Sequence, residues 1–552
     1  MKNFIFALIA FLFCLSSAKA QALQPLASTQ AATPTLDSTK LPIVAIKLPF
    51  LLPPWDPIPD TPKVTATMGI INNGYNVMNH ITDQPNGYKG KIGIEKRGSI
   101  SQAFWYLQKS YGFETRDIAG ADSDAVILGM PLEHDWVLYG PFDDESFMRN
   151  VLIYQLGRDM GYYTPRTKHC EVQFYDWLWQ PDYRGVYVMM EKIKRDNNRV
   201  NISKLTPLDN TGDAVTGGYI FGVDRNIWAN DSGWKSPYDT SVFFSYKYPK
   251  GDEITIQQKT YLKAYVDSFE TALQGPNFAN PNIGYKKFID HNTFIDFFFM
   301  QEFSKSVDAF RRSAYLYKDK KSKGGKIKAG PLWDFNSSLY NAKICTFEQD
   351  TGWAYKTTCW VNQSFHVPFW WGRLLQDSSY RNDLKCRWTQ LRSTTLDTVH
   401  IFKIIDSVRT YVGNGPSARH YTKFTLNTTL QLECDTLKWW IKKRLAWLDL
   451  KMPGNCITTA LSEKQVFENS LQVYPNPTAG QLTLDFNLYS EKKMRIELQD
   501  VYGRVLRSEP STLRQSGKNT VRFDLSGLAE GIYFLKLSDG EIRYTKKVIL
   551  EK

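Results

Sequence analysis

Residues 306–336 read SVDAFRRSAYLYKDKKSKGGKIKAGPLWDFN, and two aspartates near the ends of this stretch decide how the chain is interpreted. Residues 314–317 look like a strand, a lysine-rich turn with two glycines follows, and GPLWDFN is expected to return as the second strand of a hairpin. Asp308 stands just before the first strand and Asp334 within the second, so the hairpin is expected to bring the two carboxylates together. A shared divalent cation, or a division into base and metal ligand, would relieve their repulsion. Taken alone, Asp334 also fits a capping or turn aspartate.

The first twenty residues, MKNFIFALIAFLFCLSSAKA, combine a lysine, an apolar run and the small-x-small pattern Ala18-Lys19-Ala20. This pattern predicts a signal peptide over residues 1–20 that is removed on export. Residues 21–39 are rich in Ala, Thr, Ser, Gln and Pro and are expected to form a flexible linker. No later apolar run reaches the roughly 18 to 20 residues that a membrane-spanning helix needs, so we expect no transmembrane segment.

The cysteine content fits an exported protein. The chain has seven cysteines, and because Cys14 lies in the predicted signal peptide, six remain in the mature protein. An even number outside the cytoplasm indicates disulfides, and a bond between Cys345 and Cys359 would close a short loop. Their spacing does not match a thiolate zinc site.

The charge pattern argues against nucleic acid as a partner. The formal net charge is +12, and the lysines and arginines are scattered except at residues 318–328, KDKKSKGGKIK. We interpret this run as the solvated turn of the hairpin.

Composition divides the mature chain into two domains. From about residue 40 to 455 strand-like and helical runs alternate, and the chain's 14% aromatic residues supply a large core. A linker is expected over 456–470. Residues 471–552 contain short alternating runs separated by Gly, Pro, Asn and Asp, which predicts a small all-β sandwich.

This last segment resembles the type A sorting domain of the Bacteroidetes type IX secretion system. The resemblance rests on YPNP at 474–477, on Gly503, on LAEGIY at 528–533 and on a lysine-containing final strand. It implies passage through the periplasm, export across the outer membrane by the type IX machinery, and removal of the domain. The mature protein would then be anchored at the cell surface or released outside the cell.

Arg97 and Lys109 flank a Gly-Ser turn and are candidate phosphate-binding residues. A strand over 91–96, the turn at 98–99 and a second strand from Lys109 are expected to place Arg97 near Lys109. Backbone N–H groups and cations that converge at such a turn can hold phosphates, although strand-end cations are more often only solvated. Glu191 ends a later strand, where burial is costly without a cation, and Lys109 is the candidate partner.

Six segments, taken in order, resemble the CotH (spore-coat protein H) family of secreted, protein-kinase-like enzymes. They are RGS…QKSY, LGMP…DWVLYGPFDD…MRN, GVYVMMEKIK…RV, TGGYI, SVDAFRRSAYLYKD and GPLWDFN, within a region from about residue 58 to 448. The resemblance implies an α+β chain in which an atypical protein-kinase-like domain precedes the small all-β sandwich. It also implies an enzyme that uses ATP with Mg²⁺ or Mn²⁺ to phosphorylate Ser or Thr side chains of extracytoplasmic proteins.

The resemblance assigns catalytic and metal-binding roles. Asp308 is similar to the catalytic aspartate that accepts the proton of the substrate hydroxyl, and Asp334 is similar to the magnesium-binding aspartate. Asn336, a weaker oxygen ligand, stands where the family commonly has a second aspartate. Residues 311–313, Arg-Arg-Ser, occupy the place of an asparagine that binds a second magnesium. Both departures are expected to lower the affinity for the metal, so a weak or inactive kinase is an alternative.

The resemblance also implies that Lys109 holds the ATP phosphates, that Glu191 orients Lys109, and that Arg97 is a second phosphate contact. Gln108 stands where a second lysine is frequent in the family.

Two other functions stay open. One is a non-catalytic surface protein that uses the kinase-like scaffold as an adhesin or as a coat or assembly factor. The other is carbohydrate binding by the tryptophan-rich stretch 351–373, although Trp370 and Trp371 are better explained as core residues.

Overall fold

The computed structural model describes residues 34–50, 58–98, 100–225, 232–357, 366–456, 467–468, 470–488, 491–515, 517–539 and 543–552. The predicted signal peptide and Cys359 lie outside these ranges. The chain forms two compact units, one from Met1–Phe147, Thr167–Lys192 and Arg409–Glu433, the other from Met148–Arg166, Ile193–Val408 and Cys434–Lys552. No helix in the described ranges has the length and apolar character needed to cross a membrane.

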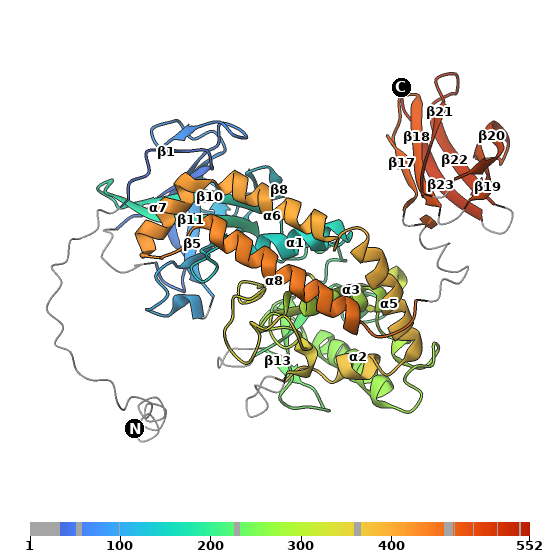
Figure 1. Cartoon of the computed structure of the whole chain (residues 1–552), viewed down its shortest axis with the longest axis horizontal. Helices are drawn as coiled ribbons and strands as arrows, with labels where there is room; N and C mark the ends of the chain where they lie inside the picture. The colour runs from blue at the N-terminus through green and yellow to red at the C-terminus, as the bar shows by residue number, and fades with distance from the viewer. Residues whose placement is uncertain are drawn as a thin grey trace. The chain divides into compact units, whose positions relative to one another are not determined.

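A closed seven-stranded barrel forms the first unit, called the barrel unit below (Figure 1). The strand order is β10-β11-β9-β6-β5-β3-β2, in which the β10–β2 pair is parallel and the other neighbours are antiparallel. Alternation along β6, SYGFETR, directs the rings of Tyr111 and Phe113 into the barrel core, where Trp136 joins them. The barrel strands are β2 (Ile43–Lys47), β3 (Val64–Ile71), β5 (Tyr88–Arg97), β6 (Ser110–Arg116), β9 (Asp135–Tyr139), β10 (Thr167–Tyr175) and β11 (Pro181–Glu191).

Helix α7 (Asn414–Phe424) packs on the outside of this barrel. The guanidinium of Arg419 forms a bidentate pair with the buried carboxylate of Glu171 at 2.6 and 3.0 Å, and Lys423 pairs with Asp182 at 3.0 Å. Cys170, in the barrel core, is a buried thiol rather than part of a disulfide. The smaller elements of this unit are β1 (Ser38–Thr39), β4 (Asn79–His80), η1 (Ile100–Gln102), β7 (Ala125–Ile127) and β8 (Met130–Glu133).

The second unit contains a five-stranded sheet with the order β13-β14-β12-β15-β16. Helix α3 (His291–Ser304) lies against it, and the run Phe297–Phe299 buries aromatic rings on several sides of the helix. The helix ends at Ser304, so Asp308 lies in the segment that follows it. The sheet strands are β12 (Tyr219–Asp224), β13 (Gly233–Lys235), β14 (Phe243–Tyr248), β15 (Ala314–Lys318) and β16 (Ile327–Ala329).

Helices supply most of the remaining core. Helix α2 begins with a capping box between Thr255 and Gln258, while Trp370 and Trp371 of α4 are 1% and 3% exposed and therefore lie in the core, as expected. These helices are α1 (Arg149–Asp159), α2 (Ile256–Gln274), α4 (Trp370–Leu374), α5 (Ser378–Arg392), α6 (Thr398–Val412) and α8 (Leu430–Lys451). Short 3₁₀ turns are η2 (Ala214–Thr216), η3 (Tyr285–Lys287), η4 (Lys321–Lys323) and η5 (Ala354–Lys356).

The hairpin at residues 314–329 differs from the expected one in its second strand. The first strand, β15, is where it was predicted, but β16 ends at Ala329 and residues 330–335 form a loop rather than a strand. Asp334 has φ 67°, a left-handed conformation that ends any strand geometry at this position. The prediction that GPLWDFN forms the returning strand was therefore wrong.

Disulfides are present but do not involve all six mature cysteines. Cys386 and Cys456 are bonded, and Cys345 is also part of a disulfide. Cys434, like Cys170, is a buried thiol. The prediction of disulfides is therefore confirmed, whereas the side chains of Cys170 and Cys434 pack as small apolar groups.

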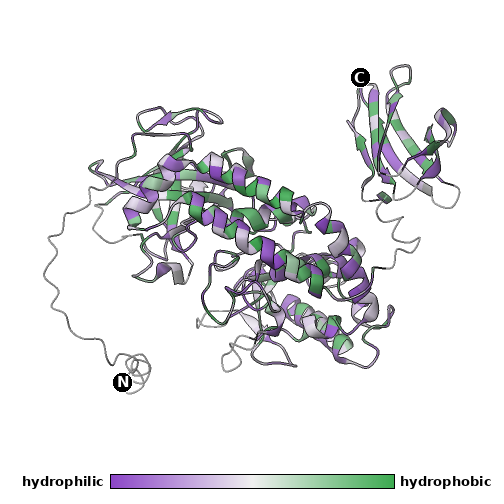
Figure 2. Cartoon of the chain, viewed as in Figure 1, coloured by the Kyte–Doolittle hydropathy of each residue, from purple (hydrophilic) through white to green (hydrophobic). Residues whose placement is uncertain are grey.

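The C-terminal residues form the expected all-β sandwich. One sheet has the order β17-β18-β21 and the other β20-β19-β22-β23, with a shared core that includes Leu484, Ile496 and Leu535. Hydrophobic and hydrophilic residues alternate along its strands (Figure 2). The strands are β17 (Gln472–Tyr474), β18 (Gln481–Leu488), β19 (Lys492–Gln499), β20 (Val505–Arg514), β21 (Gly517–Asp524), β22 (Gly531–Ser538) and β23 (Arg543–Leu550).

Candidate functional site

Asp308 lies in a tight turn between α3 and β15. Its carbonyl accepts hydrogen bonds from the backbone N–H groups of Arg311 and Arg312 at 3.2 and 3.0 Å, and its own N–H donates to Ser306 Oγ at 3.3 Å. The carboxylate is 25% exposed and lies 3.3 Å from Nη1 of Arg312. The turn therefore presents Asp308 at the surface of the second unit next to a cation.

Arg311 fixes this turn from the inside. Its side chain is 1% exposed, and its Nε and Nη2 atoms donate to the carbonyl of Val307 at 3.0 and 2.5 Å. Burial lowers the pKa of Arg311 to about 10, and nearby Asp308 opposes that shift. The guanidinium remains charged at neutral pH, so Asp308 faces two cations.

Asp334 is held by contacts from α1. Its N–H donates to the hydroxyl of Tyr154 at 3.1 Å, and the N–H of Phe335 donates to Oδ1 of Asn150 at 2.6 Å. The side chain is only partly buried, and Oδ2 accepts a hydrogen bond from the hydroxyl of Ser313 at 3.4 Å. These contacts set the left-handed backbone at Asp334 and aim its carboxylate toward the segment that carries Asp308.

Backbone hydrogen bonds join the two segments side by side. The N–H of Val307 donates to the carbonyl of Ser337 at 3.1 Å, and the N–H of Leu339 donates to the carbonyl of Ser304 at 2.8 Å. Asp308 directly follows Val307, and Asn336 directly precedes Ser337. The predicted association of the Asp308 segment with the Asp334 segment is thus achieved by two paired loops, and not by paired strands.

The side chains here offer oxygen atoms of the kind that Mg²⁺ prefers. They are the carboxylate of Asp334, the hydroxyl of Ser313 and the amide of Asn336, whose Nδ2 atom lies 3.4 Å from Ser337 Oγ. These three side chains are candidate ligands for a hard divalent cation, with a single carboxylate among them.

The barrel unit places Arg97 and Lys109 at one end of the β5–β6 pair. Arg97 is opposite Ser110 in the register, so Lys109 is its near neighbour, as predicted. The ammonium group of Lys109 donates to the carbonyls of Gln102 and Ala103 at 3.3 and 2.5 Å. Lys109 therefore holds the connection between the two strands.

Glu191 is fully buried at the end of β11, where it is opposite Trp136. On the same strand, the hydroxyl of Tyr187 donates to the carbonyl of Lys109 at 2.9 Å. Both β11 and β6 pair with β9, and the orienting role of Glu191 toward Lys109 stays a prediction.

Three residues that the structure shows to be positioning residues were given no such role from the sequence. Asn150 and Tyr154 position the Asp334 loop, and the motif MRN at 148–150 was the available signal for the first of them. Gln108, noted only as a departure from the family, is 2% exposed and donates from Nε2 to the carbonyl of Val186 at 2.8 Å. It ties the start of β6 to β11.

These features define a class of protein: an α+β region with an oxygen-rich carboxylate site, followed by a separate all-β domain. A family model described as CotH kinase protein matches residues 94–448, and one described as secretion system C-terminal sorting domain matches residues 472–551. Because the first match covers more than half of the chain, the protein belongs to the CotH kinase protein family. No curated protein matches the chain. The sorting domain makes the secretion machinery a partner and indicates secretion to the cell surface or the extracellular space.

Proposed function

We propose that this protein is a secreted protein kinase that transfers the γ-phosphate of ATP to Ser or Thr side chains of extracytoplasmic proteins. Family membership and the geometry around Asp308 and Asp334 support the proposal. Its catalytic residue is Asp308, and its metal ligands are Asp334, Ser313 and Asn336.

One observation carries the proposal. In protein kinases the two metal ligands are an aspartate of the sequence D-F-G and an asparagine five positions after the catalytic aspartate. Here Ser313 is five positions after Asp308, and its hydroxyl contacts the carboxylate of Asp334 in the sequence D-F-N. The two positions that correspond to the metal ligands are therefore in contact, with a hydroxyl in place of an amide.

Asp334, Ser313 and Asn336 would hold magnesium, which would supply positive charge to neutralise the phosphate during transfer. Asp308 would accept the proton of the substrate hydroxyl as that oxygen forms a bond to the γ-phosphorus and the bond to ADP breaks. Arg312, 3.3 Å from Asp308, supplies positive charge at the same place. The exposed position of the Asp308 carboxylate lets a substrate hydroxyl approach it.

Arg97 and Lys109 are proposed as phosphate contacts, because both stand at one end of the β5–β6 pair. Glu191, buried at the end of β11, is proposed to orient Lys109.

A second candidate is a non-catalytic surface protein, an adhesin or assembly factor built on the same scaffold. The neutral ligands Ser313 and Asn336 favour it, because they reduce the negative charge that attracts a divalent cation.

Calorimetry separates the two candidates. The full chain is titrated with a non-hydrolysable ATP analogue in Mg²⁺ and then in EDTA, together with Asp334→Ala and the exposed control Asp252→Asn. The kinase proposal predicts magnesium-dependent binding that Asp334→Ala weakens by about tenfold or more and the control leaves unchanged. Absence of nucleotide binding by the wild type in Mg²⁺ would favour the non-catalytic protein.

A further inference from the structure

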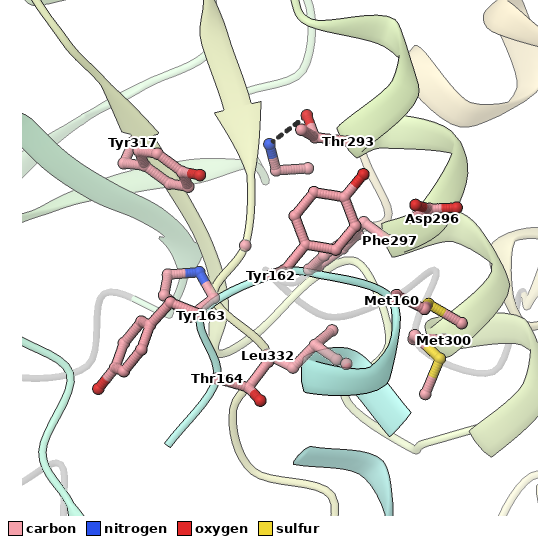
Figure 3. Close-up of a pocket in the computed structure, with 14 residues that line it drawn as sticks. Met160, Tyr162, Tyr163, Thr164, Thr293, Asp296, Phe297, Met300, Tyr317 and Leu332 are labelled. Atoms are coloured by element: carbon pink, nitrogen blue, oxygen red, sulfur yellow. Dashed lines mark hydrogen bonds between the residues drawn. The ribbon is translucent and has the colours of Figure 1, made fainter. Parts of the chain in front are cut away.

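A groove in the second unit runs along the β15–β16 hairpin, with an open volume of about 1140 Å³. Tyr163, Tyr317 and Pro331 also line a smaller cavity beside it, between the hairpin, the end of α1 and α3 (Figure 3). The groove therefore has an aromatic and apolar floor, to which Val200 and Ile202 contribute.

The rim of the groove is cationic. Lys323, Lys326 and Lys328 are exposed and line it, and in the part of the chain that the structure describes none of the three forms an ion pair. Arg199, which is 3% exposed, lines the groove from the facing segment. The three lysines therefore present their ammonium groups at the rim of the groove.

Two carboxylates also line the groove, but they do not cancel this charge. Asp319 accepts hydrogen bonds from the N–H groups of Ser203 and Lys320 at 3.0 and 2.8 Å, which together hold its pKa below the usual value. Asp290 stands at the N-terminus of α3, where the helix dipole favours its charge. Three exposed lysines against two carboxylates leave the rim of the groove with an excess of positive charge.

The lysines project from a fixed frame rather than from a loose turn. At the tip, the N–H and hydroxyl of Ser322 donate to the carboxylate of Asp213 at 3.0 and 2.5 Å. On the other strand, the N–H of Ala329 donates to Thr293 Oγ1 at 3.1 Å, as Figure 3 shows. The backbone that carries these lysines is therefore in place before a ligand binds.

The groove also lies close to the proposed catalytic loop. Pro331 lines the groove and Asp334 follows three positions later, which limits the separation of their Cα atoms to about 11 Å. A peptide whose serine lies at Asp334 could reach the lysines with residues about three or four positions away.

From these observations we infer that the groove binds an acidic segment of a protein, with carboxylates on the lysine rim and an apolar side chain on the tyrosine floor. That the bound segment belongs to the phosphorylated substrate rests on the proposed function, but the binding itself does not.

Fluorescence anisotropy tests the binding without ATP. The probe is a labelled peptide with one serine followed, from the third position on, by glutamates, and the comparison peptide has glutamines instead. The full chain is measured as wild type and as Lys323→Gln/Lys326→Gln/Lys328→Gln. A matched control, Lys403→Gln/Lys442→Gln/Lys451→Gln, removes the same charge from exposed lysines of α6 and α8.

We expect the acidic peptide to bind, the glutamine peptide to bind at least about tenfold more weakly, and the groove variant to lose about tenfold in affinity while the control keeps its affinity. Equal losses in both variants would show that net charge alone attracts the peptide and would overturn the inference. Binding to vesicles of anionic lipid, lost in the groove variant, without peptide binding would assign the groove to a membrane surface instead.

Phosphate transfer is measured on the same peptides. Binding without transfer retains the groove and argues against the kinase. Transfer with no preference for the acidic peptide retains the kinase and argues against the groove.

Discussion

The hydroxyl of Ser313 donates to the carboxylate of Asp334 at 3.4 Å, and so joins the loop that follows α3 to the loop that follows β16. This contact brings the carboxylate of Asp334 together with the neutral oxygen of Ser313. Ser313 stands five positions after Asp308. In kinases an asparagine amide fills the second place, and its carbonyl is a better metal ligand than a serine hydroxyl.

Replacing Ser313 with asparagine should therefore strengthen metal binding. We expect Ser313→Asn to raise the affinity for the Mn²⁺ complex of an ATP analogue by about tenfold. Calorimetry of the wild type and the variant measures the change, and Asp334→Ala/Ser313→Asn is the control, in which the gain should disappear. A gain that persists without the Asp334 carboxylate would place the metal elsewhere.

Asn150 is expected to act as a positioning residue for the Asp334 loop. Its Oδ1 atom accepts the N–H of Phe335 at 2.6 Å, so Asn150→Ala removes the acceptor while Asn150→Asp keeps one. We expect Asn150→Ala to lower kcat for phosphate transfer by about 10- to 100-fold with little change in KM for the peptide, and Asn150→Asp to recover most of it. Equal loss in both variants would point to a packing defect rather than to the hydrogen bond.

The buried pair of Arg444 and Glu302 should control stability. Both side chains are 0% exposed, lie 3.1 Å apart, and Arg444 also donates to the carbonyls of Asp350 and Gly352 at 3.1 and 2.7 Å. Arg444→Met would leave the Glu302 carboxylate buried without its cation, which typically costs about 3–5 kcal/mol. Urea unfolding should show this loss, whereas Lys250→Met, which breaks an exposed pair with Glu253, should cost at most about 1 kcal/mol. Similar midpoints for the two variants would contradict the importance of the buried pair.

Glu270 should make stability depend on pH. It is 1% exposed, and burial raises its pKa to about 7, although Trp370 and Ser236 donate to its carboxylate at 2.8 and 2.9 Å. Because the folded-state pKa lies above the unfolded one, the stabilising contribution is complete below the ordinary glutamate pKa and is lost as pH rises to about 7. The expected loss is on the order of 2–3 kcal/mol.

Thermal unfolding between those two pH values measures this effect. Glu270→Gln keeps an oxygen for both donors but cannot ionise, so its melting temperature should vary less with pH than that of the wild type. Parallel curves for the two proteins would exclude Glu270 as the titrating group.

Much of the fold could be predicted because local patterns were strong. Alternation predicted β5, β6 and the sandwich strands. The loop around Asp334 was mistaken for a strand, because Leu332-Trp333-Asp334-Phe335 alternates in polarity. Its backbone is instead fixed by distant partners, Tyr154 and Asn150, which no local pattern reveals.

The same distinction applies to the candidate site. Asp308 and Asp334 could be found from their motifs, whereas the register of β11 relative to β6 depends on how both strands pair with β9. Likewise, the sequence could not show whether Cys170 and Cys434 form disulfides, because their burial as thiols depends on tertiary packing.

The most direct test of the kinase proposal is phosphate transfer from labelled ATP by the full chain, with Mg²⁺ and with Mn²⁺, onto itself and onto the acidic serine peptide. Asp308→Asn removes the proposed base, Asp334→Ala removes the proposed metal ligand, and Asp252→Asn is the exposed control. The proposal predicts label with the wild type and the control and none with either site variant. Label that survives in both site variants, or wild-type protein that binds nucleotide but never transfers phosphate, would contradict it.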